Sequence, residues 1–305
     1  MTKKHILIVG GTGFIGYHLS KRCLKNRWFV TSISTKQPLK SRFLRGVQYI
    51  IVNISKKKDL VKKLNKKYDY IVNLGGHVDH SRKKKTYMSH YVGCKNIVEA
   101  LDLNYPKVFI QMGSSAEYGN NKSPLKENSK CNPTNVYGKS KLLSTKYLLN
   151  INKKKNFPIV ILRLFQAYGP KQSINRIIPI AINGCINNEK FKCSSGVQFR
   201  DFVHINDLID AIFLAFKNKT ALGNIFNIGS GQPKKIKDVI LFIKNYLNKG
   251  FPQFGKIKMR RDEVIKNYAD TRKVKKLLKW SPKISFKEGL ISTINTYIYD
   301  QKKRY

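Results

Sequence analysis

Short apolar runs recur along the first half of the chain and predict buried β-strands. Each run is apolar almost throughout, is rich in Ile, Val, Phe and Tyr, and has the length of an ordinary strand. A strand without polar alternation needs cover on both faces, which is typical of a parallel sheet. The predicted strands are Ile6–Val9, Phe29–Ile33, Val47–Val52, Tyr70–Leu74, Val108–Met112 and Ile159–Leu164.

The stretches between these strands have the spacing of amphipathic helices. Leu19, Cys23 and Leu24 fall on one helix face, and the segment around Ile97 shows the same spacing. Alternating strands and helices predict an α/β protein with a parallel sheet that is covered on both faces.

This alternation breaks after Pro170, where shorter mixed segments begin. They predict a strand at Ile225–Ile228, helices at Ile236–Leu247 and Phe286–Tyr299, and a loop at Gly250–Pro252. We therefore expect one domain, built on the parallel sheet, over residues 1–169. Residues 170–305 are expected to form a smaller mixed α/β C-terminal lobe, some segments of which can return to the first sheet.

The charge balance is strongly basic and indicates anionic partners. The 305 residues include 60 Lys and Arg but 17 Asp and Glu, a formal net charge of +43, while 41% hydrophobic residues exclude a disordered chain. The lysine runs, at Lys56–Lys58, Lys83–Lys85 and Lys153–Lys155, are scattered rather than clustered. This scatter favours biased composition over a specific nucleic-acid surface.

Cysteine usage and apolar run length indicate a cytoplasmic protein. The five cysteines form no CxxC pair, which is typical of reduced thiols. The longest apolar runs, such as Leu208–Phe216, are too short to span a bilayer. Lys3 and Lys4 before the first apolar run loosely resemble a signal peptide, but a glycine-rich segment follows at once.

That glycine-rich segment predicts a dinucleotide site. Gly10, Gly13 and Gly16 lie between the first predicted strand and the first predicted helix. Small residues there let the backbone approach a pyrophosphate, and the helix N-terminus offers free N–H groups. The strand and helix on either side are the context that this motif requires.

The end of the second predicted strand bears on which dinucleotide binds. An acid there would bind the ribose 2′-hydroxyl of NAD(H), but the chain has Ser34, Thr35 and Lys36. Hydroxyl groups and a cation suit a 2′-phosphate. We therefore favour NADP(H) as the cofactor, with NAD(H) as the alternative.

A tyrosine and a lysine four residues apart form the main candidate for acid–base chemistry. On a helix the side chains of Tyr137 and Lys141 are neighbours. An ammonium group beside a phenol favours the phenolate, so Tyr137 can exchange a proton with a substrate.

With these residues in place, the chain resembles the extended short-chain dehydrogenases/reductases that act as NDP-sugar epimerases, dehydratases and reductases. The resemblance covers almost the whole chain, in the family's order. The matching motifs are GGTGFIG (Gly10–Gly16), GSSAEYG (Gly113–Gly119), YGKSK (Tyr137–Lys141), LRLFQAYGP (Leu162–Pro170), RDFVHINDLIDA (Arg200–Ala211), NIFNIGSG (Asn224–Gly231) and YADTRKVKKLLKW (Tyr268–Trp280).

The resemblance implies that residues 1–169 form a Rossmann domain with a doubly wound parallel sheet. It also implies a Ser–Tyr–Lys centre, a nicotinamide dinucleotide, a nucleotide-diphosphate sugar as substrate and no metal. The catalytic residues would be Ser114, Tyr137 and Lys141, with Ser115 as the alternative hydroxyl if the loop is one residue out of step. The cofactor would contact Gly10, Gly13, Phe14, Ile15, Gly16, Ser34, Lys36, Asn53, Ile54, Leu74, Gly75 and Gly76, together with Tyr137 and Lys141. The substrate would contact His77, Ser115, Gln166, Arg176, Arg200 and Arg260.

Several positions depart from the family pattern. Related dehydratases carry an acid where this chain has Ala116, and Glu117 lies one place off, so dehydration is disfavoured unless the loop is shifted. Gln166 and Asn53 replace an Asn and an Asp. The segment NLGG (Asn73–Gly76) replaces the small-residue LAA that the family has after the fourth strand. His90 replaces an Asn on the following helix.

The segment His77–His80 carries two histidines three residues apart with an acid between them, a spacing that metal sites use. It follows the fourth predicted strand, where the resemblance places cofactor or substrate, and the family uses no metal. We therefore expect a cofactor or substrate loop.

The missing acids favour a reductase. The predicted reaction is reduction of a nucleotide-linked 4-keto-6-deoxy sugar by NADPH, and the alternative is an NAD-dependent NDP-sugar 4-epimerase. A more distant alternative is a non-catalytic polyanion-binding protein on this fold. The resemblance also implies a homodimer formed through the helices His90–Leu101 and Tyr137–Leu149.

Overall fold

The structure, a computed structural model, describes residues 3–64, 66–77, 81–101, 105–259 and 263–302. Its main element is a seven-stranded sheet in the order β10-β6-β5-β4-β1-β2-β3, with every neighbouring pair parallel. This order confirms the predicted doubly wound α/β fold. The strands are β1 (His5–Val9), β2 (Phe29–Ser34), β3 (Val47–Ile51), β4 (Tyr70–Asn73), β5 (Val108–Ser114), β6 (Ile159–Leu164) and β10 (Asn224–Ile228).

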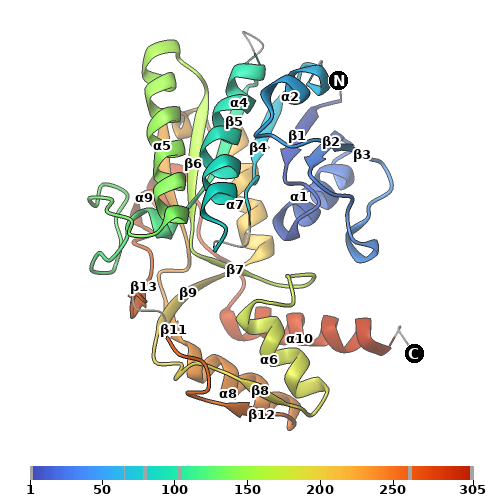
Figure 1. The fold of residues 1–305 in the computed structure, drawn as a ribbon, viewed down its shortest axis with the longest axis vertical. Coiled ribbons are helices and arrows are strands. Elements are labelled where there is room, and N and C mark those ends of the chain that lie inside the picture. Colours follow the sequence, from blue (N-terminus) through green and yellow to red (C-terminus); the bar gives the residue numbers. More distant parts are fainter. Residues whose placement is uncertain (1–2, 65, 78–80, 102–104, 260–262, 303–305) are drawn as a thin grey trace.

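Helices cover both faces of this sheet, which explains why its strands are apolar throughout (Figure 1). Ile6 and Ile8 of β1 join one buried cluster, whereas Leu7 and Val9 join another on the opposite face. The first face is covered by α1 (Phe14–Lys25), α7 (Ile205–Lys217) and α9 (Arg272–Leu278), and the second by α2 (Lys57–Lys63), α4 (Gly93–Ala100) and α5 (Val136–Lys155).

The second lobe lies beyond the carboxyl ends of the strands (Figure 1). Three helices pack around their own apolar core, beside a sheet in which β9 pairs with β7, β11 and β13. The helices are α6 (Ile177–Ile186), α8 (Ile236–Leu247) and α10 (Phe286–Lys302). The strands are β7 (Gln166–Tyr168), β8 (Lys190–Lys192), β9 (Phe199–His204), β11 (Pro233–Lys235), β12 (Phe251–Gln253) and β13 (Lys266–Asn267).

The predicted loop at Gly250–Pro252 is wrong, because Phe251–Gln253 forms β12 and pairs with β8. Proline lacks the N–H that a central strand needs, so the sequence favoured a loop. β12 belongs to a two-stranded pair, and a strand at an edge tolerates a missing donor.

Three consecutive carbonyl groups at the start of the second lobe bind side chains, the first two from the first lobe and the third from the second lobe itself. The carbonyl of Pro170 contacts the His18 ring at 2.8 Å, and that of Lys171 accepts from Arg42 Nε at 3.0 Å and Nη2 at 2.5 Å. The Gln172 carbonyl accepts the Tyr297 hydroxyl at 3.1 Å. We call these bonds the carbonyl clamp. They come from α1, from the short helix η1 (Lys40–Arg42) and from α10.

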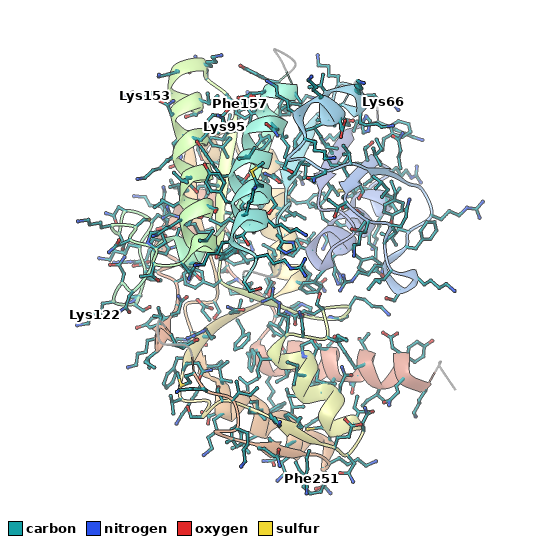
Figure 2. All side chains as sticks on the ribbon, in the orientation of Figure 1. Lys66, Lys95, Lys122, Lys153, Phe157 and Phe251 are labelled. Carbon is teal, nitrogen blue, oxygen red and sulfur yellow. The ribbon has the colours of Figure 1, made fainter. Side chains whose placement is uncertain are left out.

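The lysine side chains are spread over the molecule, and the cysteine thiols are not paired. Lysine side chains extend from loops and helices in different parts of the molecule, among them Lys66, Lys122 and Lys153 (Figure 2). All five cysteines are free, and four are buried. Within the described part of the chain, no helix is both long and apolar enough to cross a membrane.

Candidate active site

A cavity of about 1620 Å³ is lined by the carboxyl ends of the main strands and by the second lobe. Single-ligand sites usually measure about 300–1000 Å³, so this cavity has room for two ligands side by side. Every predicted site residue that the structure describes lines it. They are Gly10, Gly13, Phe14, Ile15, Gly16, Ser34, Lys36, Asn53, Ile54, Leu74, Gly75, Gly76, His77, Ser114, Ser115, Tyr137, Lys141, Gln166, Arg176 and Arg200. Arg260 lies outside the described residues.

The glycine loop fits the pyrophosphate of a dinucleotide. Gly13 is the N-cap residue of α1 and has no side chain to bind the first N–H groups of the helix. These groups therefore stay available to an anion. Gly10 has φ +76°, which favours glycine. A Cβ on Gly16 would lie 2.5 Å from Gly11 Cα, so α1 can pack this close to the loop only with glycine there.

The lining of the cavity is strongly cationic. Ser34 and Lys36, at the end of β2, both line it, and Ser34 Oγ accepts a weak hydrogen bond from the Thr12 N–H at 3.4 Å. The described lining residues include one carboxylate, that of Glu263, on the side of the second lobe. This balance suits two ligands that each carry phosphates. The cationic lining residues are Lys36, Arg42, Arg82, Lys84, Lys85, Lys141, Arg176 and Arg200.

Arg42 is a lining residue that the sequence analysis missed. Its guanidinium is largely buried, and burial lowers its pKa. Two of its nitrogen atoms bind the Lys171 carbonyl. In so basic a chain, one more arginine does not by itself indicate a site residue. The role of Arg42 becomes visible only when the fold brings residues 42 and 171 together.

Ser114, Tyr137 and Lys141 come together at the cavity from two elements. Ser114 ends β5, while Tyr137 and Lys141 lie on the first two turns of α5. Lys141 Nζ donates to the Met112 carbonyl at 2.7 Å and lies 6.0 Å from the Tyr137 ring centroid. This packing leaves Lys141 only 5% exposed to solvent.

The start of α5 is fixed by a cap and by a close approach. Asn135 Oδ1 accepts the Gly138 N–H at 2.9 Å. A Cβ on Gly138 would lie 2.4 Å from the Ala116 carbonyl oxygen, so only glycine lets α5 pack this closely on the loop after β5. This contact sets how near Tyr137 lies to Ser114.

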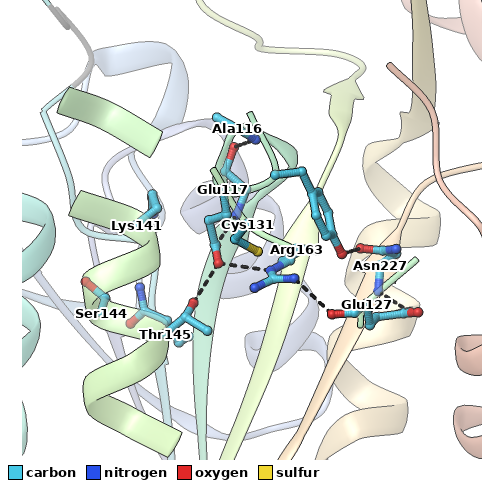
Figure 3. Close-up of polar contacts among 12 residues, drawn as sticks. Ala116, Glu117, Glu127, Cys131, Lys141, Ser144, Thr145, Arg163 and Asn227 are labelled. Carbon is cyan, nitrogen blue, oxygen red and sulfur yellow. Dashed lines mark hydrogen bonds and ion pairs between the residues drawn. The ribbon is translucent and has the colours of Figure 1, made fainter. Parts of the chain in front are cut away.

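Glu117 points away from the cavity, into a buried polar network (Figure 3). Its carboxylate accepts hydrogen bonds from the Ser114 N–H, from Thr145 Oγ1 and from Arg163 Nε, each at 2.9 Å. Ala116 lines the cavity instead. The loop is therefore not shifted in a way that would present Glu117 to a substrate.

The histidine segment is described only at its first residue. His77 lines the cavity, whereas Val78, Asp79 and His80 lie outside the described residues. His90 also lines it, from the short π-helix η2 (Met88–Val92), and its Nε2 lies 3.3 Å from the His77 carbonyl oxygen. Over the described ranges, no three His, Cys, Asp or Glu side chains form a group that could hold a metal ion.

Arg200 is more constrained than the sequence suggested. Its guanidinium forms an ion pair with Glu263 and donates to the carbonyl groups of Phe199 and Val264, at 2.7 Å and 2.8 Å. Arg176, just before α6, is exposed. Both arginines face the same cavity, where Gln166 also lies.

Comparison with protein-family models matches residues 6–229 to the NAD dependent epimerase/dehydratase family. An uncharacterised protein of Methanocaldococcus jannaschii is 30% identical, with 98% of this chain and 97% of that protein covered. A putative UDP-glucose 4-epimerase of the same organism is 28% identical, with coverage of 95% and 97%.

Among solved structures, a UDP-glucose 4-epimerase of Thermotoga maritima with UDP-glucose has a similar fold. The TM-score is 0.92 at 22% identity, and the alignment covers 97% of this chain and 99% of that one. At this identity the likeness supports the fold alone.

Proposed function

Because the chain belongs to the NAD dependent epimerase/dehydratase family, we propose that it is an NADPH-dependent reductase of a nucleotide-linked 4-keto-6-deoxy sugar. Family membership makes the protein a nicotinamide-dependent enzyme of sugar-nucleotide chemistry. The choice of reduction, and of NADPH as reductant, is the proposal.

The observation that carries the proposal is the composition of the cavity at the end of β2. Ser34, Thr35 and Lys36 line it, and no carboxylate among the described lining residues lies on that side. A 2′-phosphate finds hydroxyl donors and a cation there, whereas the 2′-hydroxyl of NAD(H) lacks the acid that usually binds it. Soluble reductases consume their dinucleotide, and NADPH is the usual reductant.

The position of Ala116 supports the same choice. A 4,6-dehydratase needs an acid at this point of the loop to eliminate water, and Ala116 has no ionisable group. The neighbouring carboxylate of Glu117 is fully buried and bound to three donors. No acid in this loop can therefore serve elimination.

The Ser–Tyr–Lys centre supplies the acid–base chemistry. Tyr137 donates a proton to the C4 oxygen of the sugar, and Ser114 donates a hydrogen bond that stabilises the developing oxyanion. Lys141 binds the nicotinamide ribose, and its Nζ lies 6.0 Å from the Tyr137 ring centroid. The nicotinamide, when bound, supplies the hydride.

The sugar nucleotide is held on the side of the second lobe. Arg176 and Arg200 bind its diphosphate, because a guanidinium group matches phosphate oxygens with paired donors. Arg200 exchanges the Glu263 carboxylate for a phosphate when substrate enters. Gln166, Ser115 and His77 contact the sugar.

A 4-epimerase is the second candidate, favoured by the names of relatives such as the putative UDP-glucose 4-epimerase. Such an enzyme returns the hydride to the same sugar and keeps its dinucleotide bound. It would consume no NADPH and would retain NAD(H) through purification. These two properties separate it from a reductase.

The test is NADPH absorbance with purified protein and a panel of GDP-, CDP- and dTDP-linked 4-keto-6-deoxy sugars, with NADH alongside. We expect stoichiometric loss of NADPH with one member of the panel. Tyr137→Phe, which keeps the ring and removes the hydroxyl, is the matched control and should slow the loss about 100-fold or more. No consumption with any member, together with NAD(H) released on denaturation, would replace the reductase with an epimerase.

A further inference from the structure

We infer that Glu117 is a positioning residue that fixes Ser114 relative to the helix carrying Tyr137 and Lys141. The inference rests on the proposed Ser–Tyr–Lys centre. Glu117 touches neither the cavity nor the reacting groups, since it is fully buried behind the loop after β5. Its carboxylate nevertheless accepts three hydrogen bonds, one each from the end of β5, from α5 and from β6 (Figure 3).

One oxygen of the carboxylate holds the backbone of Ser114. Glu117 Oε1 accepts the Ser114 N–H at 2.9 Å, and Ser114 Oγ accepts the Ala116 N–H at 3.2 Å. The two bonds form a reciprocal capping box around η3 (Ser115–Glu117). This box fixes both the main chain and the hydroxyl direction of Ser114.

The other oxygen holds α5. Thr145 Oγ1 donates to Glu117 Oε2 at 2.9 Å. Thr145 follows Lys141 by four residues and Tyr137 by eight, so all three lie along one side of the helix. A single carboxylate thus links the two elements that carry the proposed catalytic groups.

Arg163 compensates the negative charge of the buried Glu117 carboxylate. Its Nε donates to Glu117 Oε2 at 2.9 Å, and both side chains are almost fully buried. Burial alone would lower the pKa of Arg163, but Glu117 and then Tyr118 outweigh it, so the pKa is raised and the guanidinium stays charged. The pair is compensated within the protein and is not available to a ligand.

Gly113 shows that the local fold is built around this carboxylate. A Cβ on Gly113 would lie 2.6 Å from Glu117 Oε1. Only glycine leaves room for the side chain to reach the Ser114 N–H. Gly113 and Gly138 therefore have the same effect: each lets α5 and the end of β5 approach one another more closely than a side chain would allow.

Substitutions at Thr145 test the inference without disturbing the ion pair. Thr145→Val keeps the shape and removes the hydroxyl, whereas Thr145→Ser keeps the hydroxyl. We expect kcat to fall on the order of tenfold in Thr145→Val with the KM for the sugar nucleotide within about twofold, because a small misplacement of reacting groups is costly. Thr145→Ser should recover most of the loss.

Tyr118→Phe is the matched control from the same network. It removes the buried hydrogen bond of 2.6 Å from the Tyr118 hydroxyl to Asn227 Oδ1 on β10 and a polar neighbour of Arg163, but it leaves all three hydrogen bonds of Glu117 in place. We expect a lower melting temperature and an unchanged kcat. If Thr145→Val and Tyr118→Phe lower stability alike and neither changes kcat, Glu117 has only a structural role and the inference is wrong.

Dinucleotide binding separates failure of this inference from failure of the proposed reaction. Lys141 is proposed to bind the nicotinamide ribose, so a displaced α5 should raise the dissociation constant of the reduced dinucleotide about threefold, measured by its fluorescence. This measurement needs no sugar substrate. An unchanged constant in Thr145→Val overturns the inference, whereas a wild type that binds dinucleotide but reduces no keto sugar overturns only the reductase.

Discussion

The imidazole of His90 meets the ring of Tyr137 edge-on, with ring centroids 5.1 Å apart and planes at 76°. The π-helix η2 carries His90 to this place, and such helical irregularities are frequent at functional sites. On its other side the ring fills space that a side chain on Gly76 would occupy. A Cβ on Gly76 would lie 1.8 Å from His90 Cε1.

This packing predicts that Gly76 and His90 depend on each other. Gly76→Ala should weaken dinucleotide binding on the order of tenfold, because the new methyl group displaces a buried ring beside Tyr137. His90→Asn is smaller and should restore binding in the double variant. A double-mutant cycle on dinucleotide affinity would then give a coupling of about 1 kcal/mol or more. Strictly additive effects would contradict the packing argument.

Removal of the Tyr137 hydroxyl should separate chemistry from binding. We expect Tyr137→Phe to lower kcat about 100-fold or more, in line with the loss of a general acid. The dissociation constant of the dinucleotide should stay within about twofold, since the ring and its contact with His90 remain. Single-turnover measurements with saturating dinucleotide would check this, and a Tyr137→Phe enzyme with near-normal kcat would remove Tyr137 from the proposed role.

The choice of dinucleotide should follow the charge at the end of β2. Ser34→Asp places a carboxylate where we expect the 2′-phosphate, and the ratio of kcat/KM for NADPH to that for NADH should fall on the order of tenfold. Ser34→Asn has nearly the same shape without the charge and should change the ratio far less. Equal effects of the two variants would show that Ser34 is not near the 2′-position.

Acid should destabilise the fold through His204. Burial, followed by the charge of His18, lowers the pKa of His204 to about 4 from the ordinary 6.5. The unfolded chain therefore binds a proton more readily, and stability is lost as pH falls from about 6.5 to about 4. The loss should reach about 2 kcal/mol by pH 4.5.

The matched variant for that experiment is His204→Asn. His204 caps α7 through the Asn206 N–H, and asparagine is also a good N-cap. Urea unfolding of both proteins at pH 7 and pH 4.5 gives the comparison. The wild type should lose about 2 kcal/mol more than the variant, and equal losses would assign the acid sensitivity to other groups.

The main sheet could be predicted from the sequence because its strands are covered on both faces. The predicted Ile159–Leu164 coincides with β6, and the other strands differ by one or two residues at their ends. Strands such as Lys190–Lys192 were missed, because three residues with two exposed lysines carry no apolar run. Their partners come from distant parts of the chain.

The sequence predicted those parts of the candidate site in which a motif determines the backbone conformation. It did not predict the orientation of side chains that depends on distant residues. The glycine loop and the Tyr137–Lys141 pair lie where the motifs place them. The sequence left open whether Glu117 could face a substrate, because the answer depends on Arg163 and Thr145, which approach from β6 and α5. Arg42 gave no signal for the same reason.

The carbonyl clamp has a consequence for how the protein can diversify. Its bonds end on main-chain oxygen atoms of residues 170–172, so they do not depend on which side chains those residues carry. The segment also leads directly to Ser173 and Arg176, which line the cavity. A lineage can therefore exchange side chains at this border, and so change which substrate is accepted, while the attachment between the lobes is inherited intact.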